Sequence, residues 1–250
     1  MSDLHLEFIH PRKMPAFLRR ITPPTDPREI CVLAGDIGYP YSENYDTFMK
    51  HISQNFKKTF VIAGNHEYYQ SKNKKTIDET NEFLRDYMAR HPNITFLNNS
   101  CEVYENTCFI GTTLWSKITR PQYEINDVYK IPDIDYIKYN RLNRLAVDFL
   151  ESAVAEAETQ SCVIITHHLP SNDLIDPKYK TERMRPYNQW FYCDMDDFIE
   201  THRQKIGAWI YGHTHAPCVT TLHGVPMLCN PIGYPGENPW RADIGAFYDF

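Results

Sequence analysis

The sequence has no apolar stretch close to the roughly 20 residues that a membrane-spanning helix needs. It also has no excess of positive charge, because 26 Lys and Arg residues stand against 32 Asp and Glu residues, for a formal net charge of -6. Proteins that bind duplex nucleic acid usually carry a basic surface. We therefore expect no membrane partner, and a small substrate rather than a long nucleic acid.

The cysteines do not form a disulfide pattern. There are seven of them, an odd number, and their spacing is irregular. We expect reduced thiols in a cytoplasmic protein. The sequence also lacks internal repeats and low-complexity segments, and its 250 residues are 42% hydrophobic and 23% charged. This length and composition predict a single globular domain over residues 1–250, whereas oligomeric state cannot be predicted from them.

Short clusters of Asp, Asn and His residues recur along the chain. They are Asp3-Leu-His5, Gly35-Asp36, Gly64-Asn65-His66-Glu67, Thr166-His167-His168 and Gly212-His213-Thr214-His215. The last four each follow an apolar run, at 31–34, 60–63, 163–165 and 208–211, and such runs predict buried strands. Side chains at the carboxyl ends of strands can converge on one crevice. Carboxylate, amide and imidazole ligands without thiolates suit Mn, Fe or Zn.

Each cluster taken alone also has an ordinary structural explanation. Gly35-Asp36 is typical of a turn, and Asn65 is typical of a helix cap. Asp3 and His5 could be ordinary residues of a polar terminus, and His167-His168 a hydrogen-bonded buried pair. The ordered series of five clusters is what favours a metal site.

The series resembles the calcineurin-like metallophosphoesterase superfamily, whose blocks are Asp-x-His, Gly-Asp, Gly-Asn-His-Asp/Glu, a lone His and Gly-His-x-His. The resemblance covers residues 3 to about 236 and extends to SDLHLEF at 2–8, GTTLW at 111–115, THHLPS at 166–171 and NPIGYPGE at 230–237. It implies an α/β fold, a four-layer α/β/β/α sandwich of two mixed β-sheets flanked by helices. It also implies a metal-dependent hydrolase of phosphomonoesters or phosphodiesters.

The resemblance further implies two divalent metal ions and a role for individual residues. The first ion would be held by Asp3, His5, Asp36 and His215, and the second by Asp36, Asn65, His167 and His213. A hydroxide bridging the two ions would be the nucleophile. His66 would protonate the leaving group, and Glu67 or another acid would orient His66 through its other ring nitrogen.

Several assignments stay open. Because side chains alternate in direction at a strand end, only one of His167 and His168 should face the metals. The family pattern favours His167, which leaves His168 behind the ligands or against the substrate. Residues 116–138 and 173–194 are expected to form the substrate rim. Asn126, Asp127 and Tyr234 are expected either to contact the substrate or to stand behind the metal ligands. The basic and aromatic residues of 173–194 could hold a phosphate and stack a base, or simply form a solvated loop.

The first cluster departs from the family pattern, because only Met1 and Ser2 precede Asp3 where a strand is expected. Either the native chain starts upstream of Met1, or the first strand is truncated and Asp3 and His5 are loosely held. Two alternative functions remain open. One is a non-catalytic scaffold or pseudoenzyme of the same fold, which the short first strand favours. The other is a nuclease, which the excess of acidic residues disfavours.

Overall fold

Two β-sheets face each other in the computed structural model, which describes residues 1–21, 30–69, 74–158 and 161–237. The smaller sheet has the order β1-β2-β3, and both of its pairs are parallel. The larger has the order β4-β5-β6-β7-β9-β8 and is mixed, since β4 and β8 run antiparallel to their neighbours. The strands are β1 (Ile30–Ala34), β2 (Lys58–Ile62), β3 (Ile94–Phe96), β4 (Ser100–Tyr104), β5 (Thr107–Thr112), β6 (Ser161–Thr166), β7 (Ile206–Tyr211), β8 (Cys218–Leu222) and β9 (Val225–Cys229).

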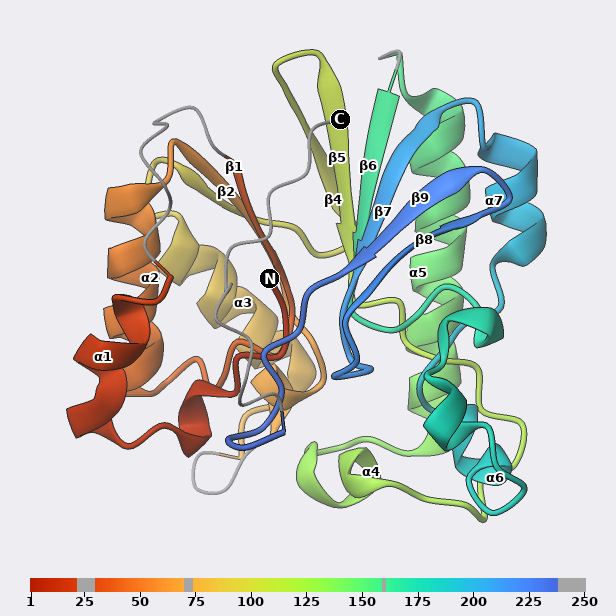
Figure 1. The fold of residues 1–250 in the computed structure, drawn as a ribbon, viewed down its shortest axis with the longest axis horizontal. Helices are drawn as coiled ribbons and strands as arrows, with labels where there is room; N and C mark the ends of the chain where they lie inside the picture. Colours follow the sequence, from red (N-terminus) through yellow and green to blue (C-terminus); the bar gives the residue numbers. More distant parts are fainter. Residues whose placement is uncertain (22–29, 70–73, 159–160, 238–250) are drawn as a thin grey trace.

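Longer helices cover the outer faces of the two sheets, and the short helices α4 and α6 lie in loops at one end of the molecule (Figure 1). The helices are α1 (Met14–Leu18), α2 (Glu43–Asn55), α3 (Ile77–Met88), α4 (Asn126–Lys130), α5 (Tyr136–Glu156), α6 (Arg185–Asn188) and α7 (Asp196–His202). Figure 1 shows α2 and α3 beyond the smaller sheet and α5 and α7 beyond the larger one. The expected four-layer α/β/β/α arrangement is confirmed.

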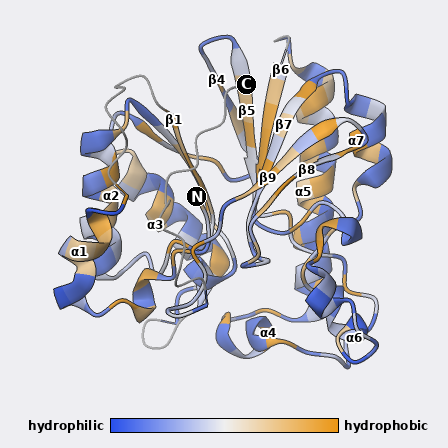
Figure 2. Cartoon of the chain, viewed as in Figure 1, coloured by the Kyte–Doolittle hydropathy of each residue, from blue (hydrophilic) through white to orange (hydrophobic). Residues whose placement is uncertain are grey.

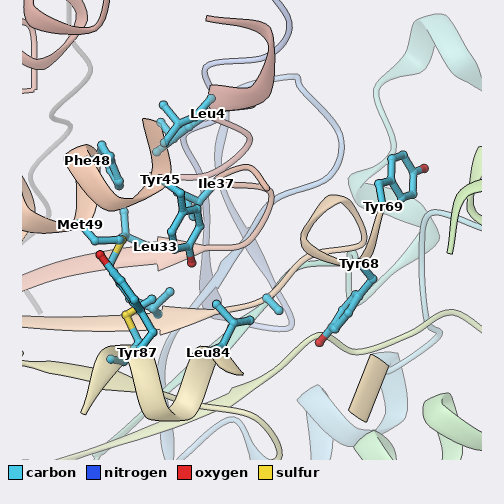
Figure 3. Packing of buried hydrophobic residues seen from close by; sticks show 14 of the residues in the cluster. Leu4, Leu33, Ile37, Tyr45, Phe48, Met49, Tyr68, Tyr69, Leu84 and Tyr87 are labelled. Carbon is cyan, nitrogen blue, oxygen red and sulfur yellow. The ribbon is translucent and has the colours of Figure 1, made fainter. Parts of the chain in front are cut away.

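The hydrophobic interior follows these layers. Between the sheets, Phe60 of β2 stacks on Phe109 of β5 with ring centroids 4.1 Å apart. On the other side of the smaller sheet, Leu33 packs in a cluster with Tyr45 and Phe48 of α2 (Figure 3). Figure 2 shows hydrophobic residues along the strands and hydrophilic residues over much of the outer helices, as burial of one helix face requires.

The local sequence explains where two of the helices begin. Helix α3 begins after Thr76, which forms a capping box with Glu79. Helix α1 begins in a segment that contains Pro11 and Pro15. Its Pro15 occupies the first turn, where a helix needs no N–H donor, so the proline is compatible with the helix. Helices α4 and α6 interrupt the two predicted rim segments.

The first three residues are held by backbone hydrogen bonds on both sides. Asp3 N–H donates to Gly35 O at 3.0 Å, and Ala34 N–H donates to Met1 O at 2.9 Å. On the other side, Ser2 forms a bridge with Pro231. The side chains of Asp3 and His5 are fully buried. The expectation that Asp3 and His5 would be loosely held is therefore not met, because backbone hydrogen bonds join this segment to the loop after β1 and to the segment around Pro231.

None of the helices in the described ranges combines the length and the apolar character that crossing a bilayer requires.

Candidate metal centre

The seven residues expected to bind metal converge where β1, β2, β6 and β7 end. Possible ligand atoms lie within 4.8 Å of one another in three groups: Asp3, His5 and His215; His5, Asp36 and His66; and Asp36, His167 and His213. Asn65 joins them, because its Oδ1 lies 3.0 Å from His167 Nε2. Asp36 belongs to two groups, and a carboxylate with two oxygens has the lone pairs to do so.

The backbone at these positions is strained. Asp3, His5, Asp36, His213 and His215 all have left-handed φ values, between 48° and 68°. This conformation is uncommon outside glycine, and sparsely populated conformations of this kind cost on the order of 1–3 kcal/mol per residue and cluster at functional sites. The concentration of this strain on five of the seven residues indicates that the positions of these side chains matter more than local stability.

The glycines of the Gly-Asp and Gly-Asn-His blocks permit close approach of two strand ends. A Cβ atom on Gly35 would lie 2.6 Å from both Gly64 N and His167 Nδ1. A Cβ atom on Gly64 would collide with Asp36 Oδ1. Any side chain at either glycine would thus push Asp36 and His167 apart.

Glu67 does not contact His66, contrary to one expectation. Its carboxylate accepts hydrogen bonds from the backbone N–H groups of Gly64 (2.6 Å), Asp36 (3.0 Å), Ile37 (2.6 Å) and Gly38 (3.2 Å). Burial and the nearby charge of Asp36 raise the pKa of Glu67 to about 7, although the backbone donors act in the opposite direction. Glu67 therefore holds the loop after β1 against the loop after β2.

The acid beside His66 is Glu7, which the sequence interpretation did not single out. Glu7 Oε1 lies 2.8 Å from His66 Nδ1, and the Glu7 side chain is only 3% exposed. On the other ring nitrogen, Tyr234 Oη lies 3.2 Å from Nε2. Burial opposes a charged imidazole, but the carboxylates of Asp36 and Glu7 outweigh it and raise the pKa of His66. The only sequence signal for Glu7 is its place within the SDLHLEF block.

Asp127, expected at the substrate or behind the ligands, lines the cleft beside the ligands and is fully buried. Its Oδ1 accepts from Asn65 Nδ2 at 2.8 Å and from the Tyr69 hydroxyl at 2.5 Å. Because the Asn65 amide nitrogen is taken up by Asp127, the Asn65 oxygen is directed toward His167. Asp127 thus orients Asn65 from behind, as outer-shell carboxylates do in metal sites.

The two adjacent histidines, His167 and His168, have different surroundings. His167 Nε2 faces Asp36 Oδ1 at 3.3 Å, while its Nδ1 lies 2.9 Å from Ala34 O. His168 has both ring nitrogens beside other groups, Thr113 O at 3.2 Å and the Tyr139 hydroxyl at 2.9 Å. Burial and the neighbouring His167 lower the pKa of His168 to about 3, so it stays neutral. His168 supports the site from the interior.

His213 offers the clearest test of whether a metal fits. Its Nε2 is buried and has no hydrogen-bond partner within the described residues, although buried polar atoms are normally paired. Burial also holds its pKa well below the usual value, which keeps the imidazole in the neutral form that binds metals. At the other end of the cluster, His215 Nδ1 lies 2.6 Å from Glu237 Oε2. The donor set fits a divalent cation of the Mn, Fe or Zn type.

Comparison with known proteins agrees with this geometry. The family model described as calcineurin-like phosphoesterase matches residues 1–217. The chain belongs to the calcineurin-like phosphoesterase family.

The chain is similar in sequence to a viral protein and in fold to bacterial ones. An uncharacterised protein, L509, from Acanthamoeba polyphaga mimivirus is 32% identical over 95% of this chain and 91% of its own. The phosphopantetheinyl hydrolase of Mycobacterium tuberculosis has the same fold, with a TM-score of 0.76 at 16% identity over 96% of this chain and 90% of that one. A candidate 5′-nucleotidase from Staphylococcus aureus, in complex with α-ketoglutarate, aligns with a TM-score of 0.53 at 13% identity, over 92% of this chain and 47% of that one. Family membership supports a metal-dependent phosphoester hydrolase.

A cleft of about 440 Å³ opens beside the ligand cluster of this phosphoesterase. Asn126, Asp127 and Tyr234, which were expected near the substrate or the ligands, all line it. Most of one wall is apolar and comes from residues 169–191, including Met184, Tyr187 and Phe191. Helices α4 and α6, which border this opening, lie at the lower edge of Figure 1. The phosphoester would thus enter between the metal ligands and a largely apolar wall.

Proposed function

We propose that this protein hydrolyses a small phosphoester at a binuclear metal centre. Asp3, His5, Asp36 and His215 would hold one divalent ion, and Asp36, Asn65, His167 and His213 the other. The observation that carries the proposal is the position of Asp36. Its Oδ2 lies 3.9 Å from His5 Nε2, and its Oδ1 lies 3.3 Å from His167 Nε2, so each oxygen faces a different set of ligands.

Two bound cations would supply an activated water and neutralise charge on the phosphoryl oxygens. The protein itself supplies the proton. His66 presents Nε2 to the cleft while Glu7 holds Nδ1, so Nε2 can donate a proton to the departing oxygen. The 440 Å³ volume and the apolar wall suit a small ester with an apolar or aromatic group.

The alternative functions receive less support. No Lys or Arg lines the described part of the cleft, which disfavours a nuclease that must track a phosphate backbone. A scaffold would not need a buried imidazole nitrogen without a partner at His213 or a carboxylate paired with His66.

The test is a paired screen on one sample. Metal content is measured together with hydrolysis of mono- and bis-p-nitrophenyl phosphate in Mn, Ni, Zn and Mg. We expect bound metal and hydrolysis in the wild type, loss of both in Asp36→Asn, and no change in Asp148→Asn, an exposed carboxylate of α5. Metal binding without hydrolysis of either ester would favour the scaffold, and absence of both would refute the metal centre.

We also propose that residues 1–250 act as one domain and that the protein is cytoplasmic. The first is supported by a shared interior between the sheets, the second by seven cysteines that are all free thiols. Limited proteolysis and cell fractionation test these two proposals.

A further inference from the structure

Charge is divided between two neighbouring pockets. The catalytic cleft is lined by the carboxylates of Asp36, Glu124, Asp127 and Glu237 and, within the described residues, by no Lys or Arg. A second pocket of about 290 Å³ has the opposite character. Its lining includes Arg120, Lys180 and Arg185 and, among the residues that the structure describes, no Asp or Glu. Three cations around one cavity are notable in a chain with a net charge of -6.

We name this second cavity the Arg120 pocket, formed by Arg120, Asn172, Lys180, Arg185, Asn188 and Gln189. Gln189 builds it by joining two distant segments. Its side-chain oxygen accepts from the backbone N–H groups of Thr119 and Arg120, both at 2.8 Å. Its amide nitrogen donates to Arg120 O and Pro186 O, both at 2.9 Å. Gln189 therefore fixes the backbone of Arg120 beside α6, which carries Arg185.

The cations of the Arg120 pocket are weakly engaged. Within the described part of the chain, neither Arg120 nor Arg185 forms an ion pair. Lys180 Nζ donates to the backbone oxygen of Asp173 at 3.3 Å and lies 4.0 Å from Asp173 Oδ1, and the side chain of Asp173 is 75% exposed. Solvent screens such a contact, so it offsets little of the positive charge. The guanidinium groups remain able to bind an anion through paired N–H donors.

The Arg120 pocket shares a wall with the catalytic cleft. Asn188 lines both cavities, and its Nδ2 donates to Tyr179 O at 3.1 Å. Tyr187 and Phe191 face the cleft, whereas Arg185 lines the Arg120 pocket. An anion held in this pocket would therefore be separated from the cleft by the residues of its apolar wall.

We propose that the Arg120 pocket is a binding site for a phosphate group. Three cations match a phosphate dianion better than a single carboxylate, and the amides of Asn172 and Asn188 add polar surface. Two kinds of ligand carry such a phosphate group: a substrate whose second phosphate reaches past the apolar wall of the cleft, or a separate phosphate compound. Only the first kind rests on the proposed phosphoesterase function.

The test observes the arginine side chains directly. In the metal-loaded protein, the Nε–Hε NMR signals of Arg120 and Arg185, assigned from R120Q and R185Q, are followed during titration with inorganic phosphate. We expect both signals to move along a saturating curve, and the signal of Arg183, an exposed neighbour outside the pocket, to stay in place. Shifts that are linear and equal in chloride of the same ionic strength would overturn the proposal. This readout does not depend on hydrolysis, so it stands apart from any failure of the phosphoesterase proposal.

A second arm separates the two kinds of ligand. Alkanediol bisphosphates of increasing linker length are compared with the matching alkyl monophosphates. A substrate subsite predicts that one linker length saturates the Arg120 and Arg185 signals at about 10-fold lower concentration than the monophosphate, because the two ends bind together. That gain should vanish in Asp36→Asn. Equal saturation by both compounds would assign the pocket to a separate phosphate ligand.

Discussion

Replacing Glu7 with Gln tests the proposed proton donor while keeping its shape. In the native protein, Glu7 Oε1 lies 2.8 Å from His66 Nδ1 in a nearly solvent-free position. Gln retains an oxygen that can accept the same hydrogen bond but removes the negative charge. Because Glu7 helps to raise the pKa of His66, its neutralisation should lower that pKa. His66 would then lose its proton at a lower pH, and the alkaline limb of the activity profile should move in that direction.

The magnitude follows from the hydrogen bond. A hydrogen bond to a charged group contributes about 1.5–3 kcal/mol, against about 0.5–1.5 kcal/mol for a neutral one. The difference of about 1–2 kcal/mol corresponds to roughly a 5- to 30-fold loss of turnover where protonation of the leaving group limits the rate. p-Nitrophenolate departs without much protonation, so its ester should lose far less.

The assay compares kcat for hexyl phosphate and p-nitrophenyl phosphate as a function of pH. Metal content is measured in parallel, because Glu7 Oε1 also lies 3.4 Å from His5 Nδ1. Glu124→Gln is the matched control, since Glu124 lines the same cleft and contacts Tyr129 instead of His66. An equal loss for both esters with metal retained would refute a role of Glu7 in protonation.

Three further predictions test the support of the site. Asp127→Asn should release the Asn65 amide and weaken metal binding roughly 10- to 100-fold by calorimetry, with the fold intact by circular dichroism. Gly64→Ala should displace Asp36 and abolish metal binding, whereas Gly224→Ala, with no atom within 4 Å of the added carbon, should leave metal binding unchanged even if its positive φ lowers stability. Because the pKa of His168 is about 3 in the folded protein and 6.5 in the unfolded chain, its contribution to stability is complete above pH 6.5 and declines as the pH falls. Chemical denaturation should show that the free energy of unfolding falls by about 2 kcal/mol more between pH 7 and pH 5 in the wild type than in His168→Asn. An equal change in the two proteins would contradict the prediction.

The sequence was most informative where chemistry and strand pattern coincide. Apolar runs ending in Gly-Asp or Gly-His predicted the strand ends, and these ends do converge. It was least informative about carboxylates. Glu7, Glu67 and Asp127 all form contacts with residues 29 to 62 positions away: Glu7 with His66, Glu67 with Gly38 and Asp127 with Asn65. Local patterns carry no record of such contacts, so the sequence left open which acid lies beside His66 and whether Asp127 contacts the substrate or a ligand.

The cluster of cations in the Arg120 pocket is another feature that the sequence did not predict. Lys180 and Arg185 stood out as basic residues in an aromatic loop, but Arg120 lies in a different segment. The hydrogen bonds of Gln189, together with the contact between the rings of Tyr123 and Tyr187, bring the two segments together. A charge cluster of this kind is a property of the fold and not of any window of sequence.

The ligands come from both sheets, which makes the metals part of how the molecule holds together. Asp36 and Asn65 follow strands of the smaller sheet, whereas His167 and His213 follow strands of the larger one. Ions bound between them would join the two halves of the sandwich at the end where the sheets are open to solvent. Free metal at about 100 times its dissociation constant would add about 2.7 kcal/mol to the free energy of unfolding. Metal supply would then set not only how fast the enzyme works but also how long each molecule survives before it unfolds.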